Sequence, residues 1–516
     1  MPIMGKKFRS MSNQLSNNNT RIAKNTIFLY LRMFITMFVG LYTSRVVLQT
    51  LGVDDYGIYN IVGGIVVLFS FISNALKNAT QRFLSFEMGK KEQGNIQKVF
   101  NVSILCHIII CLFLILLAET IGLWFCKTQL NVPANRENVI VYVYQFSVIT
   151  FLVQVMQVPF YSAIISFERM SFYAYLSILE AFLKLGIVYL LVISPVDKLI
   201  LYSALITIVS IVILFANILF CYLSLGLRLF RFENDKQSFK SLMSFSGWSM
   251  VNGCASMFSQ QGANYLMNIF SGVTANAAFG IANQVSAVIY NFVANFQSAF
   301  QPQIVKQYSA KDFSSLQQLI FRASLLSFYL LFLISLPFAI EADYILEMWL
   351  GIVPENTSIF CILLLCYFLI DAVQAPIWML IYGTGMIKEY TIVTALLTIM
   401  NLPVCWMLFN FNYPLYSFFV LRIILNFCCC IYRMIYVSKK INFPSLQYLK
   451  KVCGRILFVT SITFVMVVVC LDAQLHPLVR IFFSFFIAGL VIMFFGFDSY
   501  DRSIIFKIIK SKLFFK

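Results

Sequence analysis

The sequence predicts an all-α, polytopic membrane protein with about fourteen transmembrane helices. Of its 516 residues, 60% are hydrophobic and only 11% are charged, whereas a soluble domain carries about a quarter charged residues. A helix needs about 20 apolar residues to cross the hydrocarbon core, and runs of that length occur along almost the whole chain. These runs lack the short alternating strands of a membrane barrel.

The apolar runs are separated by short connections, none of which is long enough to hold a soluble domain. We expect the spans at residues 25–48, 57–76, 99–118, 139–162, 173–194, 199–224, 244–269, 275–300, 319–342, 358–382, 391–410, 415–436, 455–471 and 478–497.

Positive charge lies mostly in alternate connections. One set of loops holds most of the 38 Lys and Arg, whereas the opposite set holds only Lys127, Arg136 and Lys198, together with acids such as Asp55 and Glu355. Because positive loops stay on the cytoplasmic side, both termini are expected in the cytoplasm. Topology therefore accounts for the net charge of +17, and no nucleic-acid partner is expected.

A weak internal repeat relates the two halves. Tyr56–Val62 and Phe279–Val285 share an aromatic-Gly-Ile opening, and each follows a Gly-Val pair that begins at Gly52 or Gly272. Six expected spans separate the copies, so both face the same way. This pattern predicts two pseudo-symmetric six-helix bundles around a central cavity; chance similarity between apolar segments is the alternative.

The expected organisation has six parts. They are a cytoplasmic tail (1–24), an N-terminal six-helix bundle (25–224), a cytoplasmic loop (225–243), a C-terminal six-helix bundle (244–436), two additional transmembrane helices (437–497) and a basic amphipathic tail on the inner leaflet (498–516).

Residues 241–305 contain no Asp, Glu, Lys or Arg, yet carry many Asn, Gln and Ser. The polar residues recur at steps of three, four and seven, which places them on one face of a helix. Such faces either line a water-filled path or join helices by hydrogen bonds. The number of polar side chains favours a lining, and the residues proposed for it are Asn252, Gln260, Asn264, Gln284, Asn291 and Asn295.

The chain resembles the polysaccharide flippases of the multidrug/oligosaccharidyl-lipid/polysaccharide (MOP) exporter superfamily, above all the Wzx-type O-antigen and capsule flippases. The residues that carry this resemblance are Tyr42–Tyr59, Gln81–Ser85, Gly272–Val273 and Phe279–Gly280. The resemblance implies a bacterial cytoplasmic-membrane transporter rather than an enzyme. Its cargo would be an undecaprenyl-pyrophosphate-linked oligosaccharide, moved by alternating access. A polysaccharide polymerase and glycosyltransferases of the same pathway would be its partners, besides membrane lipids.

A pyrophosphate needs cations in a shielded cavity, and ionisable residues inside spans are costly unless they face protein or water. Candidates for the anion are Arg32, Lys184 and Arg422. Two of them have an alternative, because Arg32 could reach the cytoplasmic interface and Lys184 could neutralise Glu180 four residues away. Lys77 and Arg82 are candidates for the cytoplasmic mouth, where topology already explains them.

The energy source is open at this point. Asp371 and Glu180 are candidates for ion pairing or for coupling to H⁺ or Na⁺, and no other cofactor or metal is expected. A cation-coupled multidrug exporter of the same superfamily is the alternative function, and a membrane-bound polysaccharide polymerase or transferase is a weaker one. Buried cations outnumber buried acids, which favours an anionic cargo.

Overall fold

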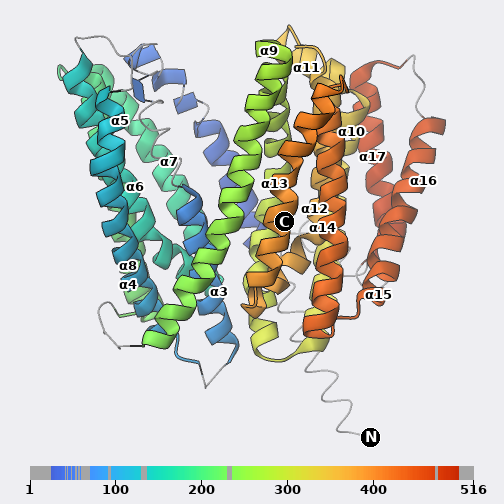
Figure 1. The fold of residues 1–516 in the computed structure, drawn as a ribbon, viewed down its shortest axis with the longest axis horizontal. Helices are drawn as coiled ribbons and strands as arrows, with labels where there is room; N and C mark the ends of the chain where they lie inside the picture. The colour runs from blue at the N-terminus through green and yellow to red at the C-terminus, as the bar shows by residue number, and fades with distance from the viewer. Residues whose placement is uncertain are drawn as a thin grey trace, which may run out of the picture. The chain divides into compact units, whose positions relative to one another are not determined.

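A computed structural model describes residues 25–40, 42–43, 45–47, 49–52, 55, 58–59, 70–90, 94–128, 136–228, 235–470, 475–498 and 502 (Figure 1). Within these ranges the chain forms helices and no strand, so the predicted all-α class is confirmed. Twelve of the described helices are long and apolar enough to cross a membrane. They are Asn25–Leu51, Ile96–Gly122, Val139–Ser166, Met170–Ile193, Lys198–Leu225, Thr274–Ser309, Phe313–Ile340, Thr357–Thr384, Lys388–Asn410, Ser417–Ile441, Ser445–Val469 and Pro477–Gly496.

The other two expected spans have separate explanations. Much of the span at 57–76 lies outside the described residues, which resume with α3 at Ser70–Gly89. The span at 244–269 is helical but belongs to α9, Lys236–Ser309. The expected terminal tails (1–24 and 498–516, apart from 498 and 502) and most of the first repeat copy also lie outside the described part of the chain.

The helix α9 must reverse its direction. Its 74 residues would extend for about 110 Å if they were straight. Asp235, which precedes the helix, pairs with Lys98 at 2.9 Å, whereas Ser309 at the other end donates to the carbonyl of Phe86 at 2.5 Å. Phe86 and Lys98 flank the same loop, so the two ends of α9 meet there. The helix therefore consists of two limbs that run in opposite directions, as the sequence predicts with its spans at 244–269 and 275–300.

The chain divides into two compact units. Unit 1 comprises Met1–Cys254 and Val305–Lys311, and unit 2 comprises Ala255–Ile304 and Asp312–Lys516. The sequence places the division in the loop at 225–243, whereas the contacts keep the first part of α9 with unit 1. Both ends of α9 therefore belong to unit 1, and its middle belongs to unit 2.

Unit 1 is built around α6, Glu137–Ser166, which packs against α3, α4 (Ile96–Leu117) and α8 (Lys198–Leu225), while α7 (Met170–Ile193) packs on α8. Apolar side chains such as Phe100, Phe160 and Ile164 fill the contacts between these helices. Capping fixes the helix ends: the carboxylate of Asp197 accepts from the first backbone N–H groups of α8.

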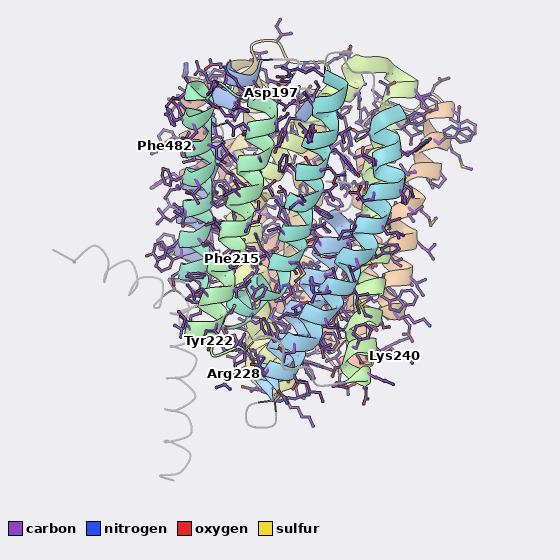
Figure 2. All side chains as sticks on the ribbon, turned by 90° about the vertical axis from the view of Figure 1, so that its left-hand side faces the viewer. Asp197, Phe215, Tyr222, Arg228, Lys240 and Phe482 are labelled. Atoms are coloured by element: carbon purple, nitrogen blue, oxygen red, sulfur yellow. The ribbon has the colours of Figure 1, made fainter. Side chains whose placement is uncertain are left out.

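The two ends of unit 1 differ in charge. Figure 2 shows Asp197 at one end of the helices and Arg228 and Lys240 at the other, with Phe215 and Tyr222 between them. Phe215 and Tyr222 are exposed, as expected of side chains that face lipid. We call the end near Arg228 and Lys240 the basic end.

Unit 2 is built around α12, Thr357–Thr384, which lies between α10 (Phe313–Ile340) and α14 (Ser417–Ile441). The helix α13, Lys388–Asn410, packs on α14. Phe279, Phe360, Phe418 and Phe419 form a buried aromatic core that joins α9 to α12 and α14. The shorter elements of the two units are α5 (Leu123–Thr128), α11 (Ala342–Leu350), α15 (Ser445–Tyr448) and π-helical turns at Ala118–Gly122, Leu449–Cys453 and Ile492–Gly496.

The C-terminal pair, α16 (Gly454–Cys470) and α17 (Pro477–Val491), attaches to unit 2 through α10. Arg480 of α17 forms an ion pair of 2.9 Å with Glu341, whose side chain is 5% exposed. Gly496 lies so close to the Tyr329 ring that a Cβ there would approach it to 3.0 Å. The additional helices are therefore closely packed onto this unit.

Candidate functional site

In unit 1, Arg32 lies against an aromatic side chain of α7. Its Nη1 donates to the hydroxyl of Tyr173 at 3.0 Å, and its guanidinium lies 4.8 Å from the centre of the same ring. Tyr161 packs edge-on against Tyr173 and interacts electrostatically with both Arg32 and Glu180. Cation–π contact holds an Arg inside a protein while keeping its charge. Arg32 therefore lies within unit 1, beside α7.

Lys184 and Glu180 form the pair that the sequence left open. The Lys184 ammonium lies 2.7 Å from the Glu180 carboxylate, one helical turn away on α7. The two side chains remain 36% and 27% exposed, so the pair is not sealed in the core. Tyr161 interacts electrostatically with Glu180 and with Arg32, so Glu180 and Arg32 lie near the same side chain. These three ionisable groups carry one net positive charge.

Unit 2 contains a polar seam between α12 and α14. Tyr367, Asp371 and Gln374 follow one another at steps of four and three on α12, so they share a face. From α14, Asn426 donates to the carbonyl of Tyr367 at 3.2 Å. Arg433, two turns further along, lies 3.8 Å from Asp371 and donates to Gln374.

Arg422 occupies one end of this seam. Its guanidinium lies 4.5 Å from the centre of the Tyr367 ring. Within the described part of the chain, no carboxylate forms an ion pair with Arg422. An Arg held by an aromatic side chain keeps most of its hydrogen-bond donors for another acceptor.

Asp371 joins three helices. The hydroxyl of Tyr290, on the return limb of α9, donates to Asp371 at 3.0 Å, and Arg433 of α14 approaches the other carboxylate oxygen at 3.8 Å. The Tyr290 ring also stacks on Phe368 at 4.6 Å. The carboxylate thus ties α9, α12 and α14 together. The pairing with an Arg that the sequence allowed is present.

Arg433 is a residue that the sequence reasoning missed. It lies near the end of a predicted span that leads into Lys439 and Lys440, where topology alone would explain a positive charge. Its neighbours Gln374 and Tyr390 come from α12 and α13, far away in the sequence. The available signal was the spacing of eleven residues from Arg422, which places both cations on one side of α14.

The predicted polar lining is not buried. Gln284 and Asn291 are exposed, and Asn252, Gln260, Asn264 and Asn295 are half-buried. Asn264 donates to Gln261 at 3.2 Å and Asn295 to the carbonyl of Asn291 at 2.8 Å, both on their own helix. These local bonds do not join one helix to another.

At the basic end of unit 1, Arg82 lies over the rings of Phe83 and Phe86, at 4.4 and 4.8 Å. Burial lowers the pKa of Arg82 to about 10, although Tyr308 and Glu87 act in the opposite direction. Lys77, the other residue predicted for the mouth, is half-buried on α3. Both cations are therefore partly covered by protein.

A buried ion pair at the same end was also missed. Lys306 of α9 lies 2.8 Å from Glu168, whose side chain is only 1% exposed. Both residues lie in predicted loops, and no sequence pattern connects positions so far apart. The pair fastens the end of α9 to the turn between α6 and α7.

Comparison with known families identifies the family of this chain. The family described as "Polysaccharide biosynthesis protein" matches residues 22–307, which is more than half of the chain. The chain belongs to this family. The resemblance expected from the sequence is therefore confirmed, whereas a search of curated proteins finds no match.

Solved structures with a similar fold include transporters of the MOP superfamily. An outward-facing multidrug resistance MATE family transporter of this superfamily has a TM-score of 0.71 at 10% identity, and the match covers 82% of this chain and 96% of the other. A MATE structure in the straight conformation has a TM-score of 0.69 at 12% identity, with the same coverage. A MOP superfamily transporter from Pyrococcus furiosus Vc1 (DSM3638), described as having a binding pocket of reverse polarity that suggests a different function, has a TM-score of 0.69, 10% identity and the same coverage. The shared fold is that of MATE transporters.

Proposed function

We propose that this protein is a flippase for an undecaprenyl-pyrophosphate-linked oligosaccharide, such as a repeat unit of O-antigen or capsule. Family membership supports the link to polysaccharide synthesis. The observation that carries the choice of cargo is Arg422, a cation inside unit 2 that lies on Tyr367 and forms no ion pair among the described residues. A guanidinium inside a transmembrane helix that has no carboxylate partner favours an anionic cargo over a cationic one.

The proposed roles follow from the chemistry of each group. In unit 1, Arg32 would offer hydrogen-bond donors to phosphate oxygens, and Lys184 would do so once the anion competes with Glu180. In unit 2, Arg422 would offer its donors in the same way. The exposed and half-buried amides of α9 would exchange hydrogen bonds with sugar hydroxyls or water. Lys77 and Arg82 would attract anionic headgroups to the basic end.

Transport would occur by alternating access in a bacterial cytoplasmic membrane, with both termini in the cytoplasm. Asp371 and Glu180 are the candidates for coupling to H⁺ or Na⁺, which would have to displace their present partners. Glycosyltransferases and a polymerase of the same pathway would supply the cargo and consume it.

The alternative is a cation-coupled multidrug exporter, because the structural neighbours include multidrug transporters. An exporter of organic cations needs carboxylates that are open to the cargo. Here Asp371 is engaged by Tyr290 and Arg433, and Glu180 by Lys184. This engagement favours the flippase.

The test is lipid transfer in proteoliposomes. The full-length protein is reconstituted with a fluorescent lipid-pyrophosphate oligosaccharide, and leaflet transfer is followed by quenching from outside. We expect Arg422→Ala and Arg32→Ala each to slow transfer by about tenfold, the effect of losing one charge-assisted hydrogen bond. Arg228→Ala, which removes an exposed cation, is the matched control. Transfer at the parent rate in both variants, or export of an organic cation with no lipid transfer, would overturn the proposal.

A further inference from the structure

The part of the polar seam in unit 2 that surrounds Arg433 is rich in hydrogen-bond donors. Arg433 donates through Nε to the hydroxyl of Tyr390 at 2.9 Å and through Nη1 to Oε1 of Gln374 at 2.5 Å. Tyr390 and Gln374 are 2% and 3% exposed. Because the Tyr390 oxygen accepts from Arg433, its own proton is directed to another acceptor.

One donor in this cluster has no acceptor. Among the described residues, Nε2 of Gln374 is buried without any hydrogen-bond partner. Its carbonyl oxygen accepts from Arg433, which fixes the orientation of the amide and leaves the two N–H groups of Nε2 without an acceptor in the described part of the chain. A buried donor without an acceptor costs free energy, so an oxygen ligand that completes this cluster would be stabilised there.

Asp371 supplies only part of the missing negative charge. Its distance of 3.8 Å from Arg433 is at the limit of an ion pair, and its other oxygen accepts from Tyr290. The Asp371 side chain is 21% exposed and that of Arg433 is 13% exposed, so the pair is not fully closed off. An entering anion could therefore take the place of this carboxylate at Arg433.

We propose that Arg433, Gln374 and Tyr390 form a second oxyanion subsite in unit 2, in which Asp371 is the resident anion that an incoming ligand replaces. The proposal rests on the flippase function and extends it. Arg433 and Arg422 lie on one side of α14, about 16 Å apart along the helix. The subsite lies toward the end of α14 that carries Lys439 and Lys440, and would receive an anionic group that enters from that end before Arg422 does. A pyrophosphate and the carboxylate of an acidic sugar share the required chemistry.

The test uses direct binding to the full-length protein in nanodiscs. Inorganic pyrophosphate and glucuronate are titrated separately by isothermal calorimetry, which distinguishes the two sources of the oxyanion. We expect Tyr390→Phe and Gln374→Leu to weaken binding of the preferred anion by about tenfold each. Tyr432→Phe is the matched control, because this neighbouring hydroxyl donates to the carbonyl of Glu389 instead.

Asp371→Asn gives an effect of opposite sign. Removing the resident charge leaves Arg433 uncompensated, so we expect the anion to bind about tenfold more tightly, whereas a merely structural role would weaken binding. The amide oxygen of Asn can still accept from Tyr290, which protects the fold. Binding that is unchanged in Tyr390→Phe and Gln374→Leu, weaker binding in Asp371→Asn, or no binding to the parent would overturn the subsite and leave a water as the ligand. Lipid transfer that depends on Arg422 would survive that failure.

Discussion

The ion pair between Glu168 and Lys306 provides a quantitative test of how α9 is anchored in unit 1. The pair measures 2.8 Å, and the side chains are 1% and 20% exposed. Removing one partner of a buried pair costs about 3–5 kcal/mol, because the other charge remains in a medium of low polarity. Since Lys306 retains some contact with solvent, we expect the lower limit, about 3 kcal/mol, for Glu168→Gln or Lys306→Met.

A double-mutant cycle isolates this interaction. The free energy of unfolding is measured by denaturant titration in detergent for the parent, both single variants and the double variant. We expect the double variant to be destabilised by less than either single variant, because it leaves no unpaired charge in the protein, so that the two single effects do not add. Lys90→Met is the control, because its 2.6 Å pair with Glu87 lies in a more exposed place and should contribute about 1 kcal/mol or less. Additive losses from Glu168 and Lys306 would refute the reasoning.

Two further predictions concern single positions in unit 1. A Cβ at Gly122 would lie 2.0 Å from the hydroxyl of Tyr144, so Gly122→Ala should lower stability by about 1–3 kcal/mol. Tyr144→Phe should restore part of this loss in thermal melts, and a double variant no more stable than Gly122→Ala would contradict the contact. The pKa of Asp235 is held below its ordinary value by hydrogen bonds from Ser238 and by Lys98. Its stabilising contribution is therefore present above the ordinary pKa and disappears as the pH falls through the lowered one, so the protection factors of the amide hydrogens in the first turn of α9 should fall in acid, and Asp235→Asn should abolish that dependence.

Much of the fold could be predicted from hydropathy and charge. Twelve expected spans coincide with described helices, because apolar length alone determines a spanning helix. The span at 244–269 does not appear among the twelve, since its polar face lowers the hydropathy that identifies a span. Its existence was instead indicated by the absence of charge across residues 241–305. The two limbs of α9 match the expected spans at 244–269 and 275–300, whereas the contacts at Phe86 and Lys98 that hold its two ends together are not revealed by the sequence.

The candidate site could be predicted only where the interactions are local. The pair of Glu180 and Lys184 follows from a spacing of four residues, which brings side chains together on any helix. The aromatic partner of Arg32 could not be predicted, because Tyr173 is 141 residues away. The same applies to Arg433, whose three polar neighbours become adjacent only when α12, α13 and α14 pack. A cation near the end of a span therefore cannot be assigned from sequence alone.

The contrast between Arg422 and Arg433 bears on how an anion could pass through unit 2. A path for an ion must bind well enough to admit it and weakly enough to release it. Arg433 meets the second condition, because Asp371 lies 3.8 Å away and would compete with any departing ligand for the guanidinium. Arg422 meets the first, because its described contact is the side chain of Tyr367 rather than a carboxylate. If the proposed function is correct, the difference in charge compensation along α14 sets a direction, from the compensated Arg433 near the Lys439 and Lys440 end of the helix to Arg422 further from that end. Asp371→Asn removes the carboxylate near Arg433, and Asn426→Asp places a carboxylate beside Arg422. The double variant, in which the compensated cation is Arg422 instead of Arg433, should then slow lipid transfer more than either substitution alone.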